Sequence, residues 1–116
     1  MPEENINKNT EEENVTKKSV EQWVKEINYY DDIELEDTIK LMTSDDYKVR
    51  FLAEYLQTKI RYNNLHRLVI KMEAGALDFV PDTPLIILKE QKSYMGQYLY
   101  QLEIRAIIEK IPLPKF

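Results

Sequence analysis

Residues 51–72 read FLAEYLQTKIRYNNLHRLVIKM, and this stretch decides the fold. One row of mostly apolar residues recurs in it at alternating spacings of four and three: Phe51, Tyr55, Thr58, Tyr62, Leu65, Val69 and Met72. Residues at these spacings lie on one face of an α-helix. The pattern therefore predicts a long helix with a continuous apolar seam, and such a seam needs a partner helix.

A second stretch supplies that partner after a short loop at residues 74–83. Its apolar residues are Leu88, Met95, Leu99, Leu102 and Ala106. Gly75 is expected to end the first helix by adopting a left-handed conformation. Thr83 is expected to cap the second helix, and Pro84 to lie in its first turn. The chain has only two glycines and no strand-like alternation. We therefore predict an all-α fold, an antiparallel helical hairpin of two long helices preceded by one or two short helices.

Three regions are expected along the chain. Residues 1–16 are acidic and almost free of apolar side chains, which predicts a disordered leader. Residues 17–45 should form the short helices, the first one capped by Ser19 and docked through Trp23. Residues 46–116 form the hairpin domain. The chain lacks the apolar core of a signal peptide and any run of about 20 apolar residues, so no membrane partner is expected.

The charges are divided unevenly between the two halves of the chain. Residues 1–46 contain 14 acidic and 5 basic side chains, whereas residues 47–116 contain 7 acidic and 11 basic ones. Either the leader is a solubilising arm, or the basic hairpin binds an anion such as a phosphate. Binding to long DNA or RNA is disfavoured by the sequence pI of about 5.0. The absence of cysteine fits a reducing cytoplasm.

Residue patterns typical of catalysis are scarce. His66 is the only histidine, and no cysteine or glycine-rich nucleophile turn accompanies it. The paired acidic residues, such as Asp31 and Asp32, are sequence neighbours, and neighbours on a helix point in different directions rather than toward one metal ion. We therefore expect a protein that is not an enzyme and has no metal or cofactor.

The cations of the first long helix suggest a ligand site. Lys48 and Lys59 are eleven residues apart, almost three helical turns, and Arg50 and Arg61 repeat that separation on the other side of the seam. Tyrosines such as Tyr47 accompany them. Nucleotide pockets use this combination, since the ring stacks on a base and the cation holds a phosphate. Charged flanks and boundary tyrosines are also common in coiled coils, so a purely structural role stays open.

The second long helix carries another apolar row, displaced from the seam. Its members are Tyr100, Ile104, Ile107 and Ile111. Either the Trp23 helix covers this row, or the row is a subunit interface, in which case the protein is a homo-oligomer.

The hairpin sequence resembles a known family. The residues that carry the resemblance are Asp46-Tyr47-Lys48, Arg50-Phe51, Ala53-Glu54-Tyr55, Lys59 with Arg61, Glu73-Ala74-Gly75 with Leu77-Asp78-Phe79, Leu88-Lys89-Glu90-Gln91, Met95, Tyr98-Leu99, and Leu102-Glu103 with Arg105-Ala106. Over about residues 44–113 the chain is similar to small proteins of crAss-like and related tailed phages. Its architecture resembles the hairpin domain of the phage sponges that sequester cyclic nucleotide messengers of CBASS or Thoeris immunity.

The resemblance implies a phage anti-defence protein, acting in the cytoplasm of the infected bacterium, that captures a cyclic oligonucleotide or related messenger without cleaving it. It implies that Tyr47 stacks on a base. The phosphate contacts would come from Lys48, Arg50, Lys59, Arg61 and Arg105. Two alternatives remain: a protein-interaction module that inhibits a host or phage protein through the second apolar row and the acidic leader, and a minor virion component.

Overall fold

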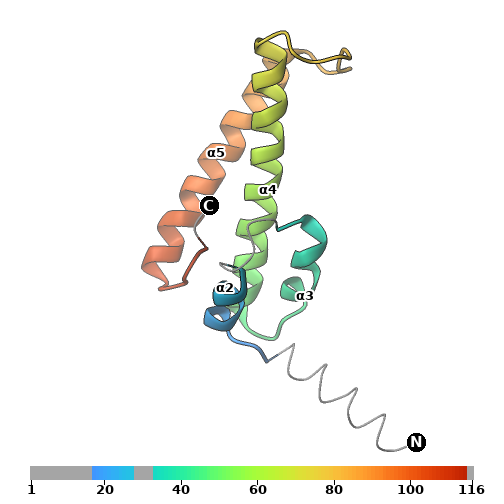
Figure 1. Ribbon diagram of the computed structural model, residues 1–116. Coiled ribbons are helices and arrows are strands. Elements are labelled where there is room, and N and C mark those ends of the chain that lie inside the picture. The colour runs from blue at the N-terminus through green and yellow to red at the C-terminus, as the bar shows by residue number, and fades with distance from the viewer. Residues whose placement is uncertain (1–16, 28–32, 115–116) are drawn as a thin grey trace, which may run out of the picture.

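The computed structural model describes residues 17–27 and 33–114, and every element within them is helical (Figure 1). Two long helices, α4 (Tyr47–Glu73) and α5 (Leu85–Ile108), form an antiparallel hairpin. Within the described residues three short elements precede it: α2 (Val20–Ile27), the 3₁₀-helix η1 (Leu35–Thr38) and α3 (Ile39–Met42). The predicted all-α fold and the two long packed helices are confirmed. The predictions for the leader at residues 1–16 lie outside the described residues.

The seam between α4 and α5 uses the residues that the sequence pattern predicts. Phe51, Tyr55 and Val69 of α4 are buried, and so are three α5 residues, Leu99, Leu102 and Ala106. Toward the tip of the hairpin the seam residues Tyr62, Leu65 and Met72 are only half-buried. The core is therefore concentrated at the base of the hairpin, where α4 begins and α5 ends.

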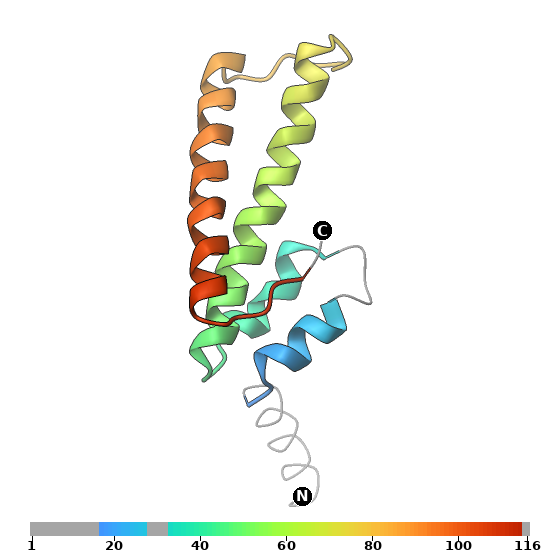
Figure 2. The same cartoon turned by 90° about the vertical axis from the view of Figure 1, so that its left-hand side faces the viewer.

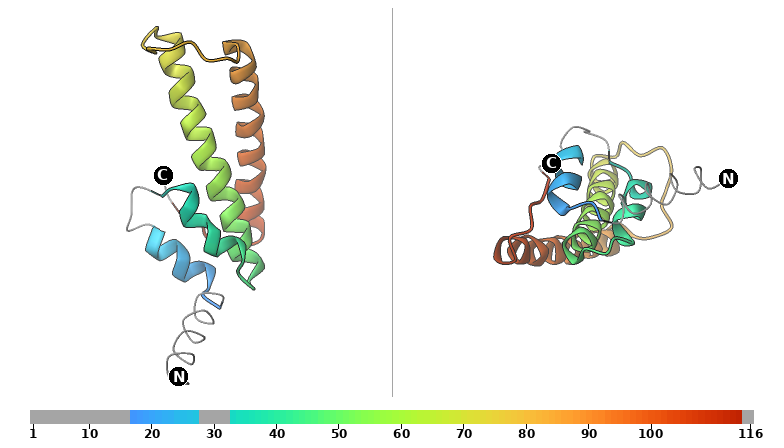
Figure 3. Two further views of the ribbon diagram at one scale, coloured as in Figure 1. Left: turned by 90° about the vertical axis from the view of Figure 1, so that its right-hand side faces the viewer. Right: turned by 90° about the horizontal axis from the view of Figure 1, so that it is seen from below.

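The short elements cover a second apolar row on α4. Val49, Leu52 and Leu56 are each at most 1% exposed, although they do not belong to the seam. They pack with Val20 and Val24 of α2 and with Leu41 of α3 in one hydrophobic cluster. Figure 3 shows α2 and α3 against the base of α4. The base of the molecule is thus built around α4, with α5 on one side and the short helices on the others.

The ends of the helices follow local rules, with one exception. Ser19 accepts a hydrogen bond from the backbone N–H of Gln22, so it caps α2 as predicted. Gly75 has a φ of 68° and ends α4 as predicted. The predicted cap at Thr83 is wrong. Pro84 takes the N-cap position with an extended ψ of 148°, which moves the first residue of α5 to Leu85.

The Trp23 helix does not cover the second apolar row of α5. Among the described helices, α2 packs against α4 alone, and α5 also packs against α4 alone. Tyr100 and Ile107 are therefore left 61% and 81% exposed. The first alternative for this row is wrong, and two of its four residues, Tyr100 and Ile107, face outward while Ile104 is half-buried.

Ile111 has a different place from the rest of that row. It is only 4% exposed and belongs to the core of its own chain, so its predicted place in a subunit interface is wrong. The chain reverses at Lys110, which has a φ of 56°, and the backbone N–H of Ile111 donates to the carbonyl of Ala106 at 2.8 Å. This reversal turns the segment after α5 back across the base of the hairpin (Figure 2), where Leu113 packs against the core.

Candidate functional site

Two of the predicted ligand-binding residues, Tyr47 and Arg105, meet at the base of the hairpin. The Tyr47 hydroxyl donates to Glu109 Oε1 at 2.8 Å, and Arg105 Nε donates to Glu109 Oε2 at 3.0 Å while Nη2 donates to the Tyr47 hydroxyl. The guanidinium also lies 4.8 Å from the centre of the Phe51 ring. Tyr47 and Arg105 both hydrogen-bond to the Glu109 carboxylate, which lowers its pKa. The cluster therefore already contains its own anion.

The other four predicted residues are spread over two flanks of α4. Arg50 donates to a backbone carbonyl oxygen at 2.7 Å. Lys59 lies with its ammonium 5.9 Å from the centre of the Tyr62 ring. One flank carries Lys48 and Lys59, and the other carries Arg50 and Arg61. The two members of each pair are eleven residues apart, which is about 16 Å along the helix axis. The structure therefore does not bring the six residues together into one site.

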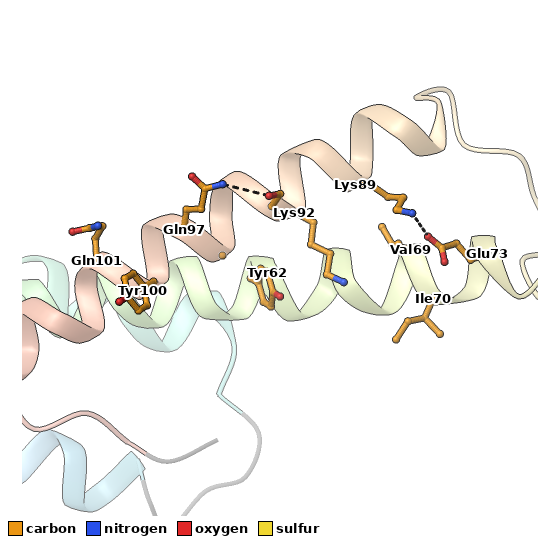
Figure 4. Close-up of a pocket in the computed structure, with 11 residues that line it drawn as sticks. Tyr62, Val69, Ile70, Glu73, Lys89, Lys92, Gln97, Tyr100 and Gln101 are labelled. Carbon is orange, nitrogen blue, oxygen red and sulfur yellow. Dashed lines mark hydrogen bonds and ion pairs between the residues drawn. The ribbon is translucent and has the colours of Figure 1, made fainter.

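A groove between α4 and α5, closer to the tip, is the more promising site (Figure 4). It has a volume of about 650 Å³. This lies within the usual range for ligand pockets, about 300–1,000 Å³. Its lining residues are Tyr62, Val69, Ile70 and Glu73 from α4, and Lys89, Lys92, Ser93, Gly96, Gln97, Tyr100 and Gln101 from α5.

Gly96 and Tyr62 shape the middle of the groove. A Cβ atom at Gly96 would lie 3.5 Å from Cε2 of Tyr62, so the tyrosine ring lies directly against the backbone of α5. On its own helix, Tyr62 stacks with His66 at a centroid distance of 6.2 Å and an interplanar angle of 7°. The His66 Nδ1 atom is buried and has no hydrogen-bond partner among the described residues. The two rings form a flat aromatic support along this flank of α4.

The groove contains two ammonium groups in different environments. Lys89 forms an ion pair with Glu73 at 2.9 Å, and this contact, with a smaller contribution from Lys92, holds the pKa of Glu73 below its ordinary value. Lys92 itself makes no ion pair within the part of the chain that the structure describes. Figure 4 shows its side chain reaching from α5 toward α4, between Tyr62 and Ile70. Among the described residues the groove therefore offers one cation without an ion pair, which lies beside the phenol ring of Tyr62, while Tyr100 lies farther along the same groove.

Tyrosines outside the groove serve as hydrogen-bond donors between the two helices. The Tyr55 hydroxyl donates to Glu103 at 3.2 Å, and the Tyr98 hydroxyl donates to Glu54. Burial and the Glu103 carboxylate raise the pKa of Tyr55 to about 12, and the bond to Glu54 raises the pKa of Tyr98 to the same value. Both phenols therefore stay protonated at neutral pH, and they fasten α5 to α4.

Residues 17–27 and 33–114 contain neither a metal-ligating cluster nor a membrane-spanning helix. No group of three or more His, Asp or Glu side chains there could hold a metal ion. No helix in these ranges has the length and apolar character needed to cross a membrane.

The chain matches the model of a known protein family. The model of the family described as Sequestin matches residues 45–108, which is more than half of the chain. The chain belongs to the Sequestin family. The Sequestin match contains α4, the connecting loop and α5, and it leaves out α2, η1 and α3. No curated protein and no solved structure matches the chain.

The family match places the groove in the part of the chain that is characteristic of a Sequestin. Every residue that lines the groove lies between positions 62 and 101, inside the matched range. The family name indicates a sequestering role, and thus ligand binding rather than turnover.

Sequence reasoning missed several residues of this Sequestin groove. It concentrated on the cations of α4, whereas the groove takes its two lysines, Lys89 and Lys92, from α5. A signal was present: Lys89, Gly96 and Tyr100 recur at helical spacings and form a row beside the seam. A glycine inside a helix often marks a place where another group approaches the backbone closely.

Proposed function

We propose that this Sequestin is a phage anti-defence protein that captures a cyclic nucleotide immune messenger of the CBASS or Thoeris type. It would hold the messenger intact in the cytoplasm of an infected bacterium. The observation that carries the proposal is the combination, in one groove, of the phenol rings of Tyr62 and Tyr100 with the ammonium of Lys92, which makes no ion pair within the described residues. The family name supports sequestration, and the chemistry of the groove supports a nucleotide as the ligand.

Each part of a nucleotide finds a suitable group in the groove. A base can stack on Tyr100, which is 61% exposed, because every base has a π-face that an aromatic ring can cover. A phosphate can accept a charge-assisted hydrogen bond from Lys92. The carboxylate of Glu73 is paired with the ammonium of Lys89, so the groove contains no unpaired negative charge from Glu73 that would repel a phosphate.

The proposal changes the role of the residues first predicted from the sequence. Lys59 remains a candidate phosphate contact, because it lies beside Tyr62 at the edge of the groove. Tyr47 and Arg105 are less suitable, since a ligand would have to displace their hydrogen bonds to Glu109.

Titration calorimetry tests the proposal with cyclic dinucleotides, cyclic trinucleotides and cyclic ADP-ribose isomers. At least one of them should bind, and denaturing the complex should release it chemically unchanged. Replacing Lys92→Met should weaken binding by about 1.5–3 kcal/mol, the range for a hydrogen bond to a charged group. Tyr100→Ala should cost about 1–3 kcal/mol through lost stacking.

Lys71→Met is the matched control for Lys92→Met. Lys71 is an exposed lysine of α4 outside the groove, so the same change in charge and side-chain length should leave binding unaltered. Equal losses in both variants would point to general electrostatics rather than to a site. If no ligand produces heat with the wild-type protein, the proposal fails. The exposed apolar row of α5 would then favour a protein-interaction module.

A further inference from the structure

The two lysines of the groove lie one helical turn apart on α5. Lys89 and Lys92 are three residues apart, which is about 4.5 Å along the helix axis, so their side chains leave the same side of the helix. Both line the groove, and Figure 4 shows both directed toward α4. The groove therefore presents two neighbouring ammonium groups to a ligand.

One of these ammonium groups has an anionic partner in residues 17–27 and 33–114, and the other has none there. Lys89 Nζ lies 2.9 Å from Glu73 Oε1, whereas Lys92 makes no ion pair. Lys89 lowers the pKa of Glu73 most, and Lys92 adds a smaller lowering, so the carboxylate lies within electrostatic reach of both cations. The Glu73 carboxylate thus marks a place in the groove where an anionic group of a ligand can be held.

The ion pair between Lys89 and Glu73 is easily opened. The two side chains are 53% and 47% exposed, and exposed ion pairs contribute little to stability because water screens them. Glu73 is also the last residue of α4, where the negative end of the helix dipole disfavours a carboxylate. A phosphate could therefore replace this carboxylate on Lys89 at little cost, and the freed Glu73 side chain would return to water.

Lys59 is the other cation close to the groove, and its position is less suitable for a phosphate beside Lys92. Its ammonium lies 5.9 Å from the centre of the Tyr62 ring, and Lys59 is not among the residues that line the groove. Lys59 is about one turn closer to the base of the hairpin than Tyr62, whereas Lys92 reaches α4 between Tyr62 and Ile70, on the side of the tip (Figure 4). Tyr62 therefore lies between Lys59 and Lys92.

We propose that the groove binds a ligand with two phosphoryl groups, one on Lys92 and one on Lys89, and that Glu73 occupies Lys89 until such a ligand displaces it. Flexible lysine side chains let the two ammonium groups adjust their separation to the ligand. A ligand with one phosphate binds Lys92 and leaves the Glu73–Lys89 pair intact, so it gains a single charge-assisted hydrogen bond. Glu73 thus acts as a selectivity residue. The identity of the ligand as a messenger rests on the proposed function, whereas the two phosphate positions do not.

Titration calorimetry with matched ligands tests this selectivity. Cyclic di-AMP and cyclic AMP have the same base but carry two phosphates and one. Cyclic ADP-ribose carries its two phosphates joined as a pyrophosphate, so it distinguishes joined phosphates from separate ones. Inorganic pyrophosphate and inorganic phosphate make the same comparison without a nucleoside. In each comparison the quantity measured is the preference for two phosphates, which is the ratio of the two dissociation constants for one protein variant.

Variants of the ion pair should change this preference in opposite directions. Glu73→Gln should raise it roughly tenfold, because a neutral amide holds Lys89 less strongly, and Lys89→Met should lower it by a similar factor. Adding Glu73→Gln to Lys89→Met should leave the ratio unchanged, since Glu73 acts on the ratio through Lys89. Glu90→Gln is the matched control, because Glu90 is an exposed residue of α5 outside the groove.

Three results would overturn the inference. In the first, Glu73→Gln leaves the ratio unchanged. In the second, Glu90→Gln shifts the ratio as much as Glu73→Gln does. In the third, Lys59→Met lowers the ratio and Lys89→Met does not, which would place the second phosphate on Lys59.

The same titrations separate this inference from the proposed function. If pyrophosphate shows the expected changes in ratio and no cyclic nucleotide binds, the two phosphate positions stand and the proposed function fails. If a cyclic nucleotide binds with the same preference in the wild-type protein and in Glu73→Gln, the proposed function stands and the inference fails. If neither pyrophosphate nor any nucleotide binds, both are overturned.

Discussion

Gly96 offers a prediction about the stability of α5. It is the twelfth residue of a 24-residue helix, and glycine in a helix interior is less favourable than alanine by about 0.5–1 kcal/mol. A Cβ atom at this position would lie 3.5 Å from Cε2 of Tyr62, an ordinary van der Waals distance. Gly96→Ala should therefore raise the free energy of unfolding by about 0.5–1 kcal/mol.

Thermal and urea unfolding followed by circular dichroism measure this effect. For a domain of this size the gain corresponds to a rise in Tm of roughly 2–8 °C. The measurements should be repeated at several protein concentrations, so that a change in association is separated from a change in folding. A loss of stability that persists at the lowest concentration would refute the reasoning, because it would mean that the neighbours of Gly96 cannot accept one methyl group.

Two further variants complete this experiment. Gly75→Ala is the contrasting control, because a φ of 68° strains any residue with a Cβ atom, and stability should fall by about 1 kcal/mol. Gly96→Leu should fill the middle of the groove and abolish messenger binding while the helix content is retained. Unchanged binding by Gly96→Leu would remove this part of the groove from the proposed site.

Three other predictions concern the chain reversal after α5 and the ion pair between Lys89 and Glu73 at the tip of the hairpin. Lys110→Gly should stabilise the protein by about 0.5–1 kcal/mol, measured by urea unfolding, because Lys110 has a φ of 56°. Ile111→Ala should lower the free energy of unfolding by about 2–5 kcal/mol in the same assay, since this side chain is only 4% exposed. A near-neutral result would mean that the Ile111 side chain is not part of the core. Lys89 lowers the pKa of Glu73, so the contribution of this pair is present above the ordinary pKa of 4.5 and is lost as the pH falls through the lowered value. Lys89→Met should remove that part of the acid sensitivity in a pH series of unfolding curves.

Local patterns were sufficient to predict the elements of this fold. The alternating spacing of residues 51–72 predicts a long helix because its period matches the helical turn, whatever surrounds it. The left-handed residue Gly75 and the cap at Ser19 were also predictable, since each depends only on residues a few positions away. The antiparallel pairing of α4 and α5 followed from the short loop between them.

Which face of each helix is covered, and by which other element, depended on contacts between distant parts of the chain. The sequence left two possible covers for the second row of α5, and the packing of α2 against α4 eliminated one. The reversal at Lys110 buried Ile111, which a helical pattern had placed with the exposed members of that row. The groove needs Tyr62 and Lys92 from different helices, and their distance depends on how α4 and α5 are rotated about their axes. A repeat along one helix specifies which residues share a face, but the rotation and the cover of that face come from side-chain packing across the whole chain.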